Sequence, residues 1–366
     1  MTLTTGYAHT PVMTAQVSEY LAPEADHVVV DATVGGAGHS CALYRQLGPG
    51  GFLVGIDQDE SALAAAEQRL AECAAQQKAS GQTPAAYLLL KGNFRDLDRL
   101  LAGVPLGYVD RILFDIGVSS PQLDDERRGF SYHPGAPLDM RMDPDGAAPT
   151  AAEILAASTE AELAALLRNG GEERWASRIA HFIVCARAQH PLHTSDDLVE
   201  VVKAAIPARE RRAGGHPARR TFQALRIAVN DELGALQQGL DCAVGWLAPG
   251  GRIGVITFHS LEDRLVKTSF AAWEDRCICP PDLPVCACGR GAILAPLTRG
   301  ALRVSTAEAQ ANPRARSARL RVARRSVPEA IQHKKNTEGG TGTGHHLSEK
   351  TEERKSEHEQ TRKEVF

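Results

Sequence analysis

Short apolar segments alternate with helical segments through the first 120 residues, and this alternation limits the choice of fold more than any other feature. The stretch "VVVDATVGG" has the valine run of a buried strand, and the glycines that follow allow a sharp turn. Alternation of strand and helix predicts a parallel, doubly wound α/β sheet. The expected strands are residues 28–36, 51–59, 86–94, 109–120 and, much later, 250–260.

The alternation stops after residue 130 and resumes only near the last of these strands. The intervening segment reads as helices, with capping pairs at Thr159 and Glu162 and at Thr194 and Asp197. Apolar residues from Phe222 to Val244 recur at three- and four-residue steps, which predicts one long helix. The expected organisation is a sheet domain in two parts, 1–130 and 221–326, a helical insertion, 131–220, and a polar, disordered tail, 327–366.

Composition sets further bounds on the 366-residue chain. It is 43% hydrophobic, enough for a sizeable core, and only 5% aromatic, so that core is expected to be aliphatic. No signal peptide is visible, and no apolar run reaches the roughly 18 to 20 residues of a membrane span. The eight cysteines do not form a secreted disulfide framework, so we expect a cytoplasmic protein with reduced thiols and no membrane contact. The sequence does not indicate an oligomeric state.

Polar residues follow four of the expected strands. They are Asp31 with the glycines after it, Asp57, Asn93 with Phe94, and Asp115. Ligands of open parallel sheets bind beyond the carboxyl ends of the strands, so these residues are expected to share one site. Asp57 lies about 20 residues after the glycines, the usual place for an acid that binds ribose hydroxyls.

Two ribose-containing ligands compete for this site. A dinucleotide would require the G-x-G-x-x-G spacing, whereas the chain has "GGAGH", and Asp31 would repel a pyrophosphate. S-adenosylmethionine carries an ammonium, a sulfonium and a ribose but no phosphate. Acids at 31, 57 and 115 favour this cationic ligand.

Long segments of the chain resemble one family in order from residue 9 to about 325. It is the bacterial methyltransferase family that modifies the exocyclic N4 amine of a cytosine in 16S ribosomal RNA. The segments are "HTPVM", "DATVGGAGHS", "GIDQD", "ILFDIGVSSPQLDDERRGFSY", "PLDMRMD", "TFQALRIAVNDEL", "GGRIGVITFHSLEDRLVK" and "NPRARSARLRVA".

The resemblance implies a class I, Rossmann-like methyltransferase sheet with a helical insertion that helps to recognise RNA. It implies S-adenosylmethionine as donor and a decoding-centre cytosine of 16S ribosomal RNA, or of the small ribosomal subunit, as acceptor. The residues that match the family's donor-binding positions are Ala37, Gly38, His39, Asp57, Phe94, Asp115 and Gln122. Ala37 stands where the family usually has glycine, and Arg219 replaces a usual threonine.

The catalytic candidates are Asp115 and His259. Related amino-methyltransferases place an acid or amide where Asp115 stands, although here Ile116 and Gly117 follow it instead of two prolines. His259 and Glu262 of "FHSLED" follow the last expected strand and offer an alternative acceptor for the amine proton. The residue that stacks on the target base is not evident.

Two basic segments and one cysteine cluster complete the candidate sites. Residues 209–220 and 312–325 are rich in arginine, which suits contacts with RNA phosphates, although a single charged segment is usually only solvated surface. The sequence "CICPPDLPVCAC" contains Cys277, Cys279, Cys286 and Cys288, whose spacing is compatible with zinc but is better explained by a metal-free loop.

Three functions therefore compete. The preferred one is S-adenosylmethionine-dependent methylation of a ribosomal RNA cytosine. The alternatives are a ribosomal RNA-binding or assembly protein without catalysis, and a nicotinamide-dependent oxidoreductase, which the glycine spacing disfavours.

Overall fold

The computed structural model describes residues 11–212, 215–274 and 291–327, which form two compact units. One unit is helical and covers Gly117–Ala235. The other contains the sheet and combines the residues up to Ile116 with those from Leu236 onward. The helical unit is wider than the expected 131–220, because the flanking Phe130 and Phe222 are buried in its core. The cysteine cluster and the C-terminal tail lie outside the described residues.

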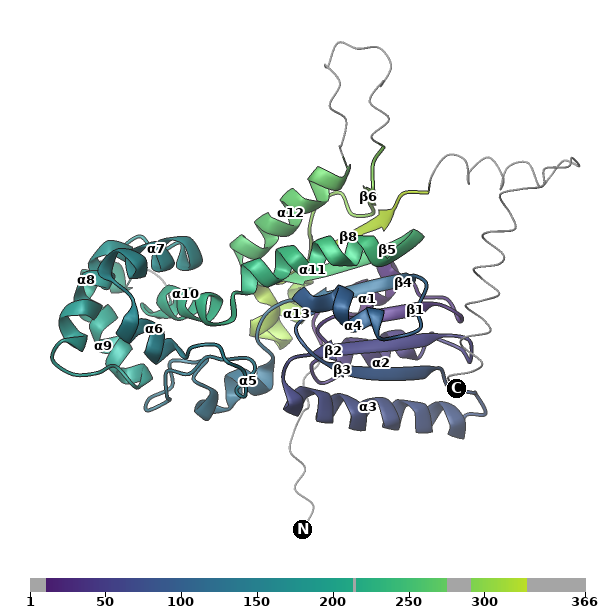
Figure 1. The fold of residues 1–366 in the computed structure, drawn as a ribbon, viewed down its shortest axis with the longest axis horizontal. Coiled ribbons are helices and arrows are strands. Elements are labelled where there is room, and N and C mark those ends of the chain that lie inside the picture. The colour runs from purple at the N-terminus through teal and green to yellow at the C-terminus, as the bar shows by residue number, and fades with distance from the viewer. Residues whose placement is uncertain (1–10, 213–214, 275–290, 328–366) are drawn as a thin grey trace, which may run out of the picture. The chain divides into compact units, whose positions relative to one another are not determined.

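The sheet follows the predicted strand–helix alternation at its centre. Five strands are parallel neighbours in the order β3-β2-β1-β4-β5 (Figure 1). The order reverses between β1 and β4, and ligands of such sheets bind at this switch point. The strands are β1 (Val28–Asp31), β2 (Phe52–Asp57), β3 (Ala86–Lys91), β4 (Val109–Asp115) and β5 (Leu247–Thr257).

The prediction of a wholly parallel sheet is wrong at one edge. Strand β8 (Arg319–Arg325) pairs antiparallel with β5, and two short strands, β6 (Leu294–Pro296) and β7 (Leu302–Arg303), pair antiparallel with β8. The segment "RLRVARR" buries Leu320 and Val322, which alternate with arginines. That period of two is a strand signal, but the arginine content led to its interpretation as a basic surface segment.

Successive residues of a strand point to opposite faces of the sheet, and the central strands are apolar on both faces. Helices therefore cover both faces. Val28 and Val30 of β1 belong to one core and Val29 to the other. Helices α4 (Leu97–Ala102), α11 (Glu232–Trp246) and α12 (Ser260–Glu274) supply apolar residues to the first core. Helices α1 (Thr14–Leu21), α2 (Gly38–Tyr44) and α3 (Glu60–Ala79) supply them to the second.

Capping boxes begin most helices of the helical unit. In α7 and α9 the capping threonine accepts from the backbone of the third helical residue, as predicted for Thr159 and Thr194. The helices of this unit are α5 (Ser120–Asp124), α6 (Ala151–Ala157), α7 (Glu160–Gly171), α8 (Ala176–Arg187), α9 (Ser195–Ala205) and α10 (Arg219–Asn230). Of all the helices in the described part of the chain, none has both the length and the apolar character to cross a membrane.

The predicted long helix from Phe222 to Val244 is two helices instead. Helix α10 ends at Asn230, and Asp231 adopts left-handed geometry with φ of 46° before α11 begins at Glu232. Asn230 is the last residue of α10, and its side chain contacts a distant loop. It donates to the carbonyl of Met140 and accepts from the amide of Met142. The apolar period carries no signal of such a break.

The sheet unit also contains short helical segments near its strand ends. They are η1 (Phe94–Asp96) after β3, and α13 (Thr306–Ala311) with η4 (Pro313–Ser317) before β8. The helical unit has η2 (Glu126–Arg128) and η3 (Glu210–Arg212).

Candidate active site

The loop after β1 is the centre of the site, and its conformation explains its small residues. Gly35 has φ of 48° and Ala37 has φ of 56°, both in the left-handed region that favours glycine. A Cβ on Gly38 would lie 2.9 Å from the Pro11 ring, so the N-terminal segment approaches the loop too closely for a side chain there. Ala37 is fully buried and its methyl is accommodated, although its backbone conformation explains why glycine would suit this position.

Asp57, at the end of β2, is held against this loop. Its Oδ2 accepts a hydrogen bond from the amide of Gly35 at 2.9 Å, and its Oδ1 accepts from the amide of Asp59 at 2.9 Å. Burial raises the pKa of Asp57 to about 6, although these two hydrogen bonds favour the carboxylate. The carboxylate therefore fixes the glycine loop and keeps acceptor capacity for the hydroxyl groups of a ribose.

His39 and Asp115 meet where the loop after β1 approaches the end of β4. Nε2 of His39 lies 3.5 Å from Oδ2 of Asp115, and the Asp115 amide donates to Oγ1 of Thr33 at 2.6 Å. Burial lowers the pKa of His39, but the charge and proximity of Asp115 outweigh it, so the pKa is raised overall. Within the described part of the chain, neither ring nitrogen of His39 nor Oδ1 of Asp115 has a hydrogen-bond partner.

The unpartnered atoms of His39 and Asp115 show which kind of ligand this site can bind. Buried polar atoms are nearly always hydrogen-bonded, so a group of them at the switch point of the sheet indicates a ligand. A partly exposed carboxylate is suited to a cation, and Asp115 is 27% exposed while His39 is only 5% exposed. The residues present therefore fit a ligand with a ribose and positive charge.

Asp31 holds the loop from within the sheet. It is buried, and its two carboxylate oxygens accept from Oγ of Ser40 at 2.6 Å and from the amide of Thr33 at 3.2 Å. Burial raises the pKa of Asp31 against the effect of these hydrogen bonds. The sequence predicts Asp31 beside a ligand cation. In the structure both of its carboxylate oxygens accept hydrogen bonds from the protein, and the side chain orders residues 33–40.

Phe94 lies in η1 after β3, and it is half-buried against the sheet core. Its ring packs edge-on against Phe114 with centroids 5.6 Å apart. A Cβ on Gly239 of α11 would lie 2.8 Å from its ring. Asn93 precedes it and caps η1 by accepting from the amide of Arg95. Phe94 therefore has a packing role, and its assignment as a donor-binding residue stays a prediction.

Gln122 belongs to the helical unit and caps α5. Its Oε1 accepts from the amide of Ser119 at 3.0 Å, while the Gln122 amide donates to Oγ of Ser119. The sequence "SSPQ" carries this capping-box signal, which the sequence analysis did not use. Its assignment as a donor-binding residue stays a prediction beside this structural role.

His259 lies beyond the end of β5, the strand next to β4. Asp115 pairs with Ile256 in the register of these two strands, which brings the two catalytic candidates to the same edge of the sheet. Nε2 of His259 is 2.9 Å from Oε1 of the buried Glu262, whose Oε2 accepts from the amides of Phe258 and His259. Glu262 thus orients His259 and caps the start of α12.

One positioning contact was missed from the sequence. Oε1 of Glu308 in α13 accepts from the amide of Met13 at 2.6 Å. Met13 is buried in left-handed geometry with φ of 57°, two residues after the Pro11 that contacts the glycine loop. Ser305 caps α13 three residues before Glu308, which is a recognisable signal for the helix but not for its distant partner.

The second basic segment divides into structural and exposed arginines. Arg319 and Arg321 bind the two carboxylate oxygens of Asp263 at 2.6 and 2.8 Å. One nitrogen of Arg325 donates to three carbonyls at the end of α11, including that of Val244. Arg314, Arg316 and Arg324 are exposed, and the first two lie together in η4, where an RNA phosphate can reach them.

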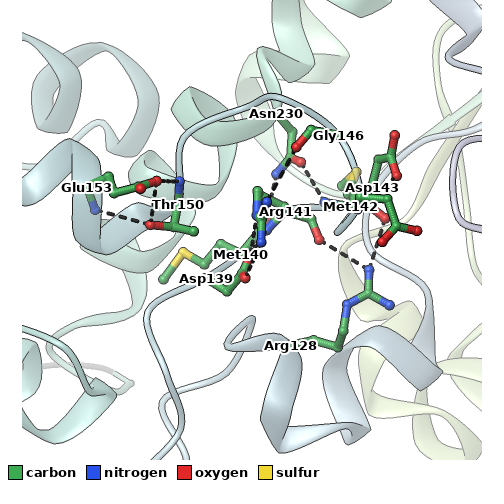
Figure 2. Close-up of polar contacts among 11 residues, drawn as sticks. Arg128, Asp139, Met140, Arg141, Met142, Asp143, Gly146, Thr150, Glu153 and Asn230 are labelled. Atoms are coloured by element: carbon green, nitrogen blue, oxygen red, sulfur yellow. Dashed lines mark hydrogen bonds and ion pairs between the residues drawn. The ribbon is translucent and has the colours of Figure 1, made fainter.

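The "PLDMRMD" segment forms a rigid loop in the helical unit (Figure 2). Met140 is buried with φ of 64°, and Asn230 binds the backbone on both sides of Arg141. Arg141 donates two hydrogen bonds to the carboxylate of Asp139 at 2.9 and 2.8 Å, which lowers the Asp139 pKa despite its partial burial. The contacts of this pair are those of a salt bridge that stabilises the loop.

The sheet order, the glycine loop and the acids at the ends of β2 and β4 define a class I methyltransferase. The MraW methylase family model matches residues 6–326, and the chain belongs to that family. S-adenosylmethionine is therefore its methyl donor.

The curated relatives agree with this assignment. Ribosomal RNA small subunit methyltransferase H of Symbiobacterium thermophilum is 53% identical over 315 residues, which are 86% of this chain and 96% of that protein. The protein of the same name from Heliobacterium modesticaldum is 51% identical over 318 residues, 87% of this chain and 98% of the relative. A solved rRNA methylase of Streptococcus thermophilus is 10% identical with a TM-score of 0.36, over 86% of this chain and 93% of that one.

Proposed function

We propose that this protein transfers the methyl group of S-adenosylmethionine to the exocyclic N4 amine of a cytosine in the decoding centre of 16S ribosomal RNA. The observation that carries the proposal is the group of unpartnered polar atoms on His39 and Asp115 beside the Asp57-anchored loop. The curated relatives, named as small-subunit ribosomal RNA methyltransferases, support RNA as the acceptor. The reaction on ribosomal RNA or the small subunit places the protein in the cytoplasm.

The residues of the sheet unit have distinct roles toward the donor. Asp57 accepts hydrogen bonds from the ribose hydroxyls, and the backbone of Ala37 and Gly38 lines the loop beside them. Phe94 is a further donor contact that we propose in this unit, and Gln122, which belongs to the helical unit, stays a predicted donor contact. When bound, S-adenosylmethionine supplies an electrophilic methyl group on a positively charged sulfur.

Asp115 is the group best placed to act on the acceptor. The N4 amine of cytosine is a weak nucleophile because its lone pair is shared with the ring. An acceptor for its N–H hydrogen bond restores part of that lone pair, and a fixed orientation toward the methyl group lowers the barrier further. The carboxylate of Asp115, which is 27% exposed and lies 3.5 Å from Nε2 of His39, is such an acceptor.

His259 is the second candidate for the amine proton. It lies at the same edge of the sheet as Asp115, and Glu262 fixes its ring. The target base must leave its stack to reach this edge. The helical unit and, separately, the exposed arginines of η4 are proposed to bind RNA.

Methyl transfer with labelled donor tests the proposal. Unmodified small ribosomal subunits are incubated with the protein and methyl-labelled S-adenosylmethionine, and the RNA is digested to nucleosides. Label in N4-methylcytidine is the expected result. Label in another nucleoside contradicts the proposed target, and RNA binding without any transfer favours the alternative of a non-catalytic assembly protein.

A further inference from the structure

The helical unit presents an aromatic pair at its surface. Tyr132 is 44% exposed, and its ring stacks on that of His216 with centroids 4.0 Å apart and the planes parallel. Among the described residues, only Tyr108 of the sheet unit is a comparably exposed large hydrophobic residue, at 47%. Exposure of such a ring is unfavourable in water unless a partner covers it.

Neighbouring groups hold this pair in place before any partner arrives. The edge of Tyr132 packs against buried Phe222 of α10 at 6.0 Å, with the rings at 90°. Nδ1 of His216 accepts from the amide of Ala218 at 3.3 Å. Burial, together with the charge of Lys203, lowers the pKa of His216, so its ring is neutral near pH 7. The pair is therefore a rigid, uncharged stack of two rings.

Basic residues follow the stack in the sequence. Arg219 and Arg220 begin α10 immediately after it and are exposed. Arg220 donates to the carbonyl of Glu172, whereas the guanidinium of Arg219 has no partner within the part of the chain that is described. Lys203 forms an ion pair with Glu200 at 2.8 Å. An aromatic face beside free arginine is the combination that binds single-stranded nucleic acid, because bases stack and phosphates pair with the charge.

We propose that Tyr132 and His216 form a stacking platform for an unpaired RNA base, with Arg219 binding an adjacent phosphate. This inference rests on the proposed function and adds a contact to it, since no base-stacking residue was evident from the sequence. The platform contains none of the methyl-transfer residues, so the base that it binds is not the one held for methylation. Stacking is tolerant of base identity, so the platform contributes affinity more than sequence choice.

Binding of an oligoribonucleotide tests the platform directly. The full-length protein is titrated into a short single-stranded RNA that carries 2-aminopurine, whose fluorescence is quenched by stacking. Tyr132→Leu, which removes the ring, is expected to weaken binding roughly 5- to 100-fold and to reduce the quench. Tyr132→Phe retains the ring and is expected to match the unmodified protein. Tyr108→Leu is the control, because it removes the other exposed ring.

The outcomes separate this inference from the proposed function. Equal RNA affinity for Tyr132→Leu and Tyr108→Leu overturns the platform, whether or not the unmodified protein transfers methyl groups to small subunits. Weakened RNA binding by Tyr132→Leu in a protein that transfers no methyl group supports the platform and contradicts the proposed function. If Tyr132→Leu does not fold, His216→Ala removes the second ring and is expected to weaken binding as well, with an unchanged affinity again overturning the platform.

Discussion

Nε2 of His39 lies 3.5 Å from Oδ2 of Asp115, and this pair joins the loop after β1 to the end of β4. The two strands are the neighbours at which the strand order reverses. Among the described residues, neither Nε2 of His39 nor the buried Oδ1 of Asp115 has a hydrogen-bond partner, so both groups keep hydrogen-bonding capacity for a ligand. A ligand at this position therefore meets a carboxylate that is already oriented.

Donor affinity is expected to depend on the ionisation of Asp57. Its pKa of about 6 means that the carboxylate is largely ionised at pH 8 and largely protonated at pH 5. Ribose hydroxyls donate to the ionised form, so donor affinity falls as the pH decreases through about 6. Calorimetric titration of S-adenosylmethionine between pH 5 and pH 8 measures this dependence.

Variants of Asp57 separate charge from structure. Asp57→Ala is expected to cost about 1 to 3 kcal/mol of donor binding, because hydroxyls lose a charged acceptor. Asp57→Asn keeps an acceptor for the Gly35 amide but does not titrate, so its affinity should be weaker and independent of pH over this range. A pH dependence that persists in Asp57→Asn assigns the titration to another group.

Glu308 is expected to position the donor loop from a distance. Its hydrogen bond to the Met13 amide fixes the segment whose Pro11 contacts Gly38. Glu308→Ala removes the acceptor and is expected to destabilise the fold by about 1 to 3 kcal/mol and to weaken donor binding. Glu308→Gln keeps an acceptor oxygen and should recover most of both. Thermal unfolding and donor titration of the two variants check this, and equal effects of Ala and Gln contradict a role for the hydrogen bond.

The arginines of the last segment are expected to separate into two groups. Replacing Arg314 and Arg316 by alanine should weaken RNA binding and reduce its dependence on salt, with donor affinity unchanged. A protein that makes fewer phosphate contacts releases fewer counterions from the RNA when it binds. A filter-binding series over salt concentration gives the slope. An unchanged slope means that these two residues do not contact phosphate.

Arg319 provides the matched control, because it is an arginine of the same segment whose side chain binds the buried Asp263. Arg319→Ala is expected to cost about 1 to 2 kcal/mol of stability, by leaving the buried Asp263 with Arg321 alone. Asp263 is buried, which opposes ionisation, yet hydrogen bonds from both arginines lower its pKa. The depressed pKa means that this stabilisation is present above the ordinary aspartate pKa of about 3.9 and is lost as the pH falls below it. Denaturation at pH 7 and pH 3 should therefore show a smaller effect of Arg319→Ala at the lower pH.

The centre of the fold could be predicted because its signals are local. Valine runs such as Val28 to Val30 and the alternation with helices give five parallel strands, and capping pairs such as Thr159 with Glu162 mark helix starts. Strand β8 was missed because arginines occupy its outward positions, and the break at Asp231 was missed because an apolar period continues across it.

The site could be predicted only as far as residue types and strand ends allow. Because Asp57 and Asp115 stand at the ends of two expected strands, the sequence predicts that both lie at the carboxyl edge of the sheet. The contacts that decide roles join distant segments, such as His39 to Asp115 and Met13 to Glu308, and no spacing in the sequence encodes them. The capping role of Gln122 could be predicted from "SSPQ", whereas the family resemblance indicates only a ligand-binding role for this residue.

The roles of Asp115 and His259 are separable by rate measurements at saturating donor. If Asp115 only helps to hold S-adenosylmethionine, Asp115→Asn loses donor affinity and saturating donor restores the rate. If Asp115 also accepts the hydrogen bond or proton of the amine, the rate falls even at saturation, because asparagine keeps an acceptor oxygen but has no charge. We expect a fall of roughly tenfold to ten-thousandfold in single-turnover methylation. His259→Ala, measured beside it, is expected to reduce the rate less, since Nε2 of His259 is close to Glu262. A rate for Asp115→Asn equal to that of the unmodified protein, with a large loss in His259→Ala, would transfer the acceptor role to His259 and leave Asp115 as a donor ligand.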